Sequence, residues 1–115
     1  MVLEAILPEV YTFIDFASHE CEFARRKGIN TVKTHIGGEI PEIHPMPYNV
    51  YLPVSEYLKK NPSEVDTLIK FLDQEFKKSK YGYKKVEFKK ETYTYKKNTF
   101  GKKTDLPYID VVFEF

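Results

Sequence analysis

The most regular hydrophobic pattern lies in the middle of the chain, where apolar residues recur every three or four positions. These residues are Val65, Leu68, Ile69, Leu72 and Phe76. The spacing places them on one face of a helix, with charged residues on the other side. The preceding Asn61, Pro62 and Glu64 have the order of an N-cap, a first-turn proline and a capping-box glutamate. The pattern therefore predicts an amphipathic helix over residues 62–78, with a helical turn over residues 55–60 leading into it.

The N-terminal third allows two interpretations. Apolar residues recur there at helical spacing, which predicts one long helix with an apolar stripe. They are Val10, Ile14, Ala17, Cys21 and Ala24. However, residues 10–16, VYTFIDF, are rich in strand-forming residues, and a shorter helix would then begin near Ser18. In both cases the basic residues before Gly28 indicate a helix end near Lys27, so we expect a helix over at least residues 18–27 and leave residues 10–16 open.

Strict alternation of apolar and polar residues marks the C-terminal end. Ile109, Val111, Phe113 and Phe115 fall on one side, which predicts a strand over residues 108–115. Upstream, residues 84–97 have the pattern of a strand or a bent pair of strands. Residues 98–105, NTFGKKTD, have the composition of a hairpin loop.

The segment between the two helical patterns is rich in glycine and proline. A short strand is expected first, over residues 29–36, with Ile29 and Val32 partly buried. Residues 37–53, GGEIPEIHPMPYNVYLP, then contain two adjacent glycines and four prolines, so they predict an extended, non-helical loop. Apolar side chains are expected to anchor this loop, namely Ile40, Ile43, Met46, Tyr48, Val50 and Tyr51.

Together these elements predict an α+β fold with about two helices packed on a small, mostly antiparallel sheet that carries a C-terminal β-hairpin. The length of 115 residues and the hydrophobic content of 42% fit a single domain over residues 1–115. The one cysteine, Cys21, excludes an internal disulfide and favours a reducing, cytoplasmic compartment. The start of the chain does not resemble a signal peptide, and no apolar run is long enough to span a membrane. The strand order and the oligomeric state stay open.

Charge is strongly segregated along the chain. The formal net charge is +1, but residues 77–103 contain eleven lysines against two acidic residues, Glu87 and Glu91. Tyrosines and phenylalanines are interleaved with these lysines, and we call residues 77–103 the lysine-rich arm. Segregation of this kind bears on binding partners rather than on the fold.

Lysines interleaved with aromatic residues are typical of surfaces that contact phosphates and stack on bases. The candidate binding residues are Lys84, Lys85, Lys89, Lys90, Tyr93, Tyr95, Lys96, Lys97, Lys102 and Lys103. Because the arm contains no arginine, non-specific nucleic-acid binding is expected rather than base reading. The alternative is a protein-interaction module, such as an inhibitor or assembly factor, whose arm docks on an acidic protein surface. Adjacent lysines in a strand point to opposite faces, which argues against one continuous basic surface.

No catalytic signature accompanies the arm, so we expect a non-enzymatic protein without a cofactor. His19, Cys21, His35 and His44 are residue types that bind zinc. Their spacing does not match a zinc motif, because residues two apart on a helix point in different directions. We therefore expect no metal site and interpret Cys21 as a packed core residue.

Overall fold

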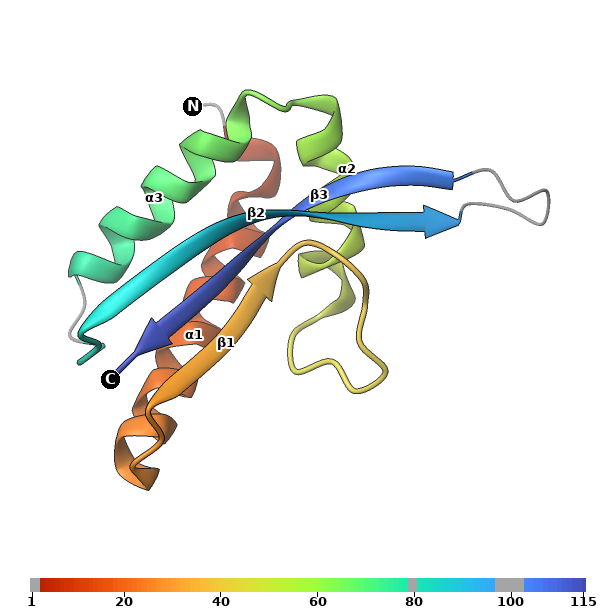
Figure 1. Ribbon diagram of the computed structural model, residues 1–115. Helices are drawn as coiled ribbons and strands as arrows, with labels where there is room; N and C mark the ends of the chain where they lie inside the picture. The colour runs from red at the N-terminus through yellow and green to blue at the C-terminus, as the bar shows by residue number, and fades with distance from the viewer. Residues whose placement is uncertain (1–2, 79–80, 97–102) are drawn as a thin grey trace.

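The computed structural model describes residues 3–78, 81–96 and 103–115, and it has the predicted α+β architecture (Figure 1). Helices α1 (Leu7–Lys27), α2 (Leu52–Lys60) and α3 (Glu64–Lys78) lie on one side of a three-stranded sheet. The strands are β1 (Thr31–Ile36), β2 (Lys85–Lys96) and β3 (Lys103–Glu114), and short 3-10 helices precede α1 and α2. No helix within these described ranges is long and apolar enough to cross a membrane.

Helix α1 is continuous, so residues 10–16 are helical rather than extended. Its buried residues are Val10, Phe13, Ala17, Cys21 and Ala24. Burial of this stripe outweighs the strand propensity of the individual residues, because propensity differences are smaller than the free energy of burying a large apolar side chain. Gly28 ends the helix in the left-handed conformation with φ of 70°, as predicted.

The junction between α2 and α3 differs from the predicted capping box. The side chain of Asn61 donates a hydrogen bond from Nδ2 to the carbonyl oxygen of Tyr57 at 3.0 Å, so it caps the end of α2. Glu64 is buried, and its carboxylate accepts a hydrogen bond from the Tyr57 hydroxyl. This bond, followed by burial, raises the pKa of Tyr57 to about 12. Glu64 therefore contacts Tyr57 of α2, whereas the sequence pattern predicted that it would cap α3.

The sheet has the order β1-β3-β2, and β3 is antiparallel to both neighbours. Strand β2 is a single strand of 12 residues rather than a bent pair. Strand β3 begins at Lys103, earlier than the predicted start at Tyr108, so its first residues occupy part of the expected hairpin loop. Residues 98–102 of that loop lie outside the described residues. The alternation within β3 is confirmed, since Ile109, Val111 and Phe113 are fully buried.

The prediction of a non-helical loop over residues 37–53 is wrong at its C-terminal end. Tyr48–Val50 forms a 3-10 helix, and α2 begins at Leu52 with a proline in its first turn, a position that proline tolerates. Among the expected apolar anchors, Met46, Val50 and Tyr51 are buried. Ile43 is 90% exposed, and Ile40 and Tyr48 are also exposed. The loop is therefore fixed at its end nearest α2.

We expect Gly37→Ala to lower the free energy of unfolding by about 2–5 kcal/mol, combining the cost of a left-handed alanine with that of overpacking. Gly37 has φ of 82°, and a Cβ there would lie 2.7 Å from Ser55 Oγ. Gly28→Ala is the matched control, because Gly28 has φ of 70° with no atom within 4 Å of the added Cβ. Urea denaturation of both variants measures the difference. Equal losses would contradict a tight contact at Gly37.

Candidate functional site

The helices cover one face of the sheet and leave the other uncovered (Figure 1). Register fixes which side chains share the uncovered face, because directly paired residues of antiparallel strands point the same way. We call this surface the open face. By register, its described residues are Thr31, Lys33, His35, Lys85, Glu87, Lys89, Glu91, Tyr93, Thr104, Leu106, Tyr108, Asp110, Val112 and Glu114. Leu106 is buried, so this face is not fully open at the Tyr93 end.

The candidate lysines of the arm are divided between the two faces. Lys85 and Lys89 lie on the open face with Tyr93, whereas Lys90 lies on the helix side and forms an ion pair with Asp66 of α3. Lys103 has the same register parity as Lys90, and Lys84 precedes β2. Tyr95 and Lys96 belong to β2, but their side chains are not described, and Lys97 and Lys102 lie outside the described residues.

Acidic residues alternate with lysines on the open face. Glu87 forms an ion pair with Lys85 at 2.6 Å, and this neighbour lowers the pKa of Glu87. Asp110 stands between His35 and Lys89 in one row across the three strands. The described residues of this face include three lysines against four acids, which are Glu87, Glu91, Asp110 and Glu114. The open face is therefore mixed in charge rather than basic.

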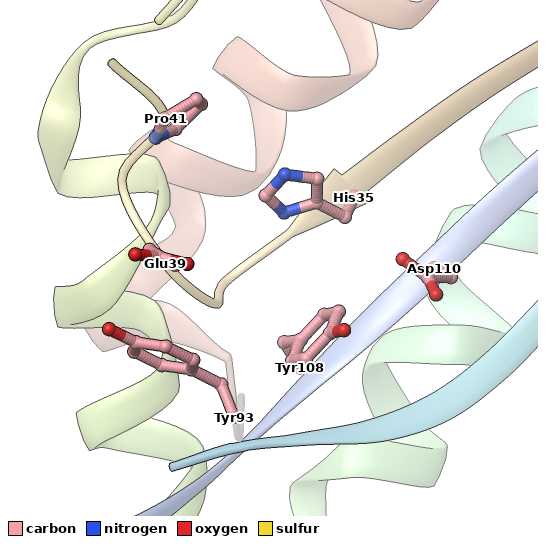
Figure 2. A pocket seen from close by; sticks show the side chains of 6 residues that line it. All are labelled: His35, Glu39, Pro41, Tyr93, Tyr108 and Asp110. Atoms are coloured by element: carbon pink, nitrogen blue, oxygen red, sulfur yellow. The ribbon is translucent and has the colours of Figure 1, made fainter. Parts of the chain in front are cut away.

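One end of the open face contains a surface cavity of about 270 Å³ (Figure 2). It is lined by His35, Glu39, Pro41, Tyr93, Tyr108 and Asp110. We call it the tyrosine–carboxylate pocket. Glu39 and Pro41 come from the loop after β1, and the other four come from the three strands, so the sheet register and the loop together build it.

The geometry of the pocket is fixed by close backbone and ring contacts. The Nδ1 atom of His35 lies 2.8 Å from the carbonyl oxygen of Gly37. Because a carbonyl oxygen only accepts, Nδ1 carries the hydrogen and the neutral ring keeps its lone pair on Nε2. The His35 and Tyr108 rings meet edge to face with centroids 5.8 Å apart. Gly38 lies under the Tyr108 ring, where a Cβ would be 3.2 Å from it, so glycine allows this close approach.

The surroundings of Tyr108 disfavour its phenolate form. Burial, and then the neighbouring carboxylates of Asp110 and Glu91, raise the pKa of Tyr108. The sequence patterns indicated Tyr93 as a binding residue and His35 only as a possible zinc ligand, and they did not indicate Tyr108, Glu39 or Asp110. The adjacent glycines at 37 and 38 were the local signal, since paired glycines often mark a close approach of the backbone to another group.

The four residues considered for zinc are dispersed. His19 is exposed on α1, Cys21 is buried in the same helix, and His35 and His44 lie on β1 and in the following loop. Among the described residues, no three His, Cys, Asp or Glu side chains are placed to hold a metal ion. Nor does any family model, curated protein or solved structure match the chain. The surface chemistry of the sheet is thus the basis for inferring function.

We expect Cys21 to resist alkylation by iodoacetamide in the folded protein at pH 8. Burial raises the pKa of the Cys21 thiol to about 12, so the reactive thiolate is scarce and the sulfur is enclosed. Mass spectrometry should find labelling only after denaturant is added. Rapid stoichiometric labelling without denaturant would contradict the packed position of this residue.

Proposed function

We propose that this protein is a non-catalytic binding module that docks another protein on its open face and the β2–β3 hairpin. The observation that carries the proposal is the alternation of lysines and acids across this uncovered surface. Phosphate backbones favour contiguous cations, and the acids at Glu87, Glu91 and Asp110 would repel them. A partner protein can present complementary charges of both signs, which provides specificity and register.

The shape of the hairpin supports a docking role. Strands β2 and β3 have 12 residues each, whereas β1 has six, so the distal half of the hairpin extends past the end of β1. In Figure 1 the end of the hairpin reaches past α2, toward the right of the view, although Lys59 of α2 still donates a hydrogen bond to the carbonyl oxygen of Asp105 on β3. A projecting hairpin next to an uncovered sheet face gives a partner two adjoining surfaces to contact.

The experiment that tests this proposal separates protein from nucleic acid. The tagged protein is incubated with an extract of the cells that produce it, with and without nuclease, and the bound partner is then purified and recombined with it alone. We expect a protein that stays bound after nuclease treatment and rebinds in the purified system. Loss of every bound protein on nuclease treatment, or no rebinding, would refute the proposal.

A second candidate function, non-specific nucleic-acid binding, is favoured by one observation at the end of the hairpin. The backbones of Lys96 and Lys103 are paired by register at the last described position of the hairpin. The adjacent Lys97 and Lys102 add two further cations in the sequence. Such a local concentration of lysines in the sequence suits a nucleic-acid backbone, whose binding is dominated by phosphate contacts.

This second candidate makes a separate prediction. Replacing Lys96, Lys97, Lys102 and Lys103 with glutamine should flatten the slope of log affinity against log salt by about three units, since each lost phosphate contact removes about 0.7–0.9. Fluorescence anisotropy with labelled single-stranded and duplex probes at several salt concentrations measures the slope. Lys27, Lys60 and Lys70 changed to glutamine provide the control, because these exposed lysines lie on the helices. No binding by the unmodified protein at low salt would exclude this function.

A further inference from the structure

We propose that the tyrosine–carboxylate pocket binds an organic cation, either an alkylammonium or a guanidinium group. Such a group is carried by small free amines and by the lysine and arginine side chains of proteins. The inference goes beyond the proposed docking function and does not depend on it, because a small amine tests the pocket without any protein partner.

The side chains of the pocket have the arrangement that a cation requires. Figure 2 shows Glu39 and Asp110 on opposite sides of the pocket, with the Tyr108 ring between them, the Tyr93 ring below Glu39, and His35 and Pro41 completing the wall. The faces of tyrosine rings attract cations through their quadrupole, and carboxylates add charge-assisted hydrogen bonds. The Nε2 lone pair of His35 is a further acceptor for an N–H group.

The local charge favours a cation over an anion. Glu39 and Asp110 both line the pocket, and Glu91 is the register partner of Tyr108. Neither Glu39 nor Asp110 forms an ion pair with another residue in the described part of the chain. The lysine nearest by register is Lys89, opposite Asp110, and it is exposed. Lys89 is therefore an internal competitor for the site rather than a fixed partner of Asp110.

The size of the pocket suits a cationic head group with a short aliphatic chain. About 270 Å³ is slightly below the usual range of about 300–1,000 Å³ for small-molecule sites, which limits the ligand to a small head group in this cavity. A neighbouring cavity of about 260 Å³ shares Glu39 and Tyr93 with it and is otherwise lined by Ile40 and Leu52. A ligand can therefore place its cation between the carboxylates while its methylene groups contact these apolar side chains.

The test is an NMR titration of the full chain with n-butylammonium, butylguanidinium, and lysine or arginine blocked at both ends. n-Butanol and butyrate are the neutral and anionic controls. We expect the cations to shift the amide signals of His35, Glu39, Tyr93 and Tyr108, and the controls to leave them unchanged. If the blocked amino acids bind more tightly than the simple amines, the natural ligand is a basic side chain; the reverse order indicates a free amine.

Variants make the assignment specific. Glu39→Gln and Asp110→Asn should each weaken cation binding about five- to tenfold, within the range for partly exposed cation contacts. Lys89→Gln should strengthen binding, because it removes the competing ammonium. Glu42→Gln, an exposed carboxylate of the same loop that does not line the pocket, should have no effect. Absence of cation shifts in the folded protein, equal binding of butyrate, or unchanged affinity in the folded Glu39/Asp110 double variant would overturn the proposal.

Discussion

Replacing Phe113 with alanine is expected to lower the free energy of unfolding by about 3–5 kcal/mol, the usual cost of truncating a buried phenylalanine. Phe113 is fully buried on the central strand. Its ring lies 5.1 Å from that of Phe76 on α3 and 5.5 Å from that of Tyr83, measured between centroids. The residue thus joins the sheet to α3, and its loss leaves a cavity at the contact between them.

Urea denaturation followed by circular dichroism measures this effect. Ile43→Ala is the control, because Ile43 is an apolar residue that is 90% exposed, and surface substitutions usually change stability by less than about 0.5 kcal/mol. Small domains have a total stability of about 5–15 kcal/mol, so the Phe113 variant should be visibly destabilised. Similar losses for the two variants would contradict the position of Phe113 in the core.

Reversing the charge of Lys33 and Lys89 together is expected to weaken binding of the protein partner at least about 100-fold, since like-charge contacts at an interface cost several kcal/mol. Both side chains are exposed on the open face, on opposite edge strands. Neither lysine forms an ion pair with another described residue, but a carboxylate in place of Lys89 would lie opposite Asp110, so we expect a stability loss of up to about 1 kcal/mol, well below the loss of partner binding.

The matched control for this double variant is Lys70→Glu with Lys60→Glu. These lysines are also exposed, but they lie on α3 and α2, away from the open face. Isothermal titration calorimetry with the purified partner compares the three proteins at one salt concentration. Equal weakening by both double variants would indicate a general charge effect rather than docking on the sheet.

Local chemistry was sufficient to predict several elements of the fold. The helix end at Gly28 follows from the conformational freedom of glycine, and the alternation in β3 follows from a strand with one buried face. The division of the arm lysines between the two faces of the sheet could also be predicted, because they occur in adjacent pairs and neighbouring residues of a strand point to opposite faces. By contrast, Asn61 and Glu64 have a strong local signature, but packing between α2 and α3 gives both side chains other partners.

The pocket could not be predicted from local patterns because it depends on long-range register. Asp110 meets His35 only because β1 and β3 pair as they do, and Glu39 joins them through the turn at Gly37 and Gly38. His35 and Asp110 are 75 positions apart in the chain. Neither composition nor spacing distinguishes them from ordinary surface residues, so only the folded arrangement reveals their proximity.

Cross-saturation NMR tests the docking of a protein on the open face most directly. Strand β3 has a neighbouring strand on each side along residues 109–114 and helices behind it, so a partner can approach its amides only from the open face. With the deuterated protein bound to its protonated partner, we predict signal loss at the amides of Asp110 and Val112, with Lys70 on α3 unaffected. Signal loss confined to the helices, with β3 unchanged, would contradict the account.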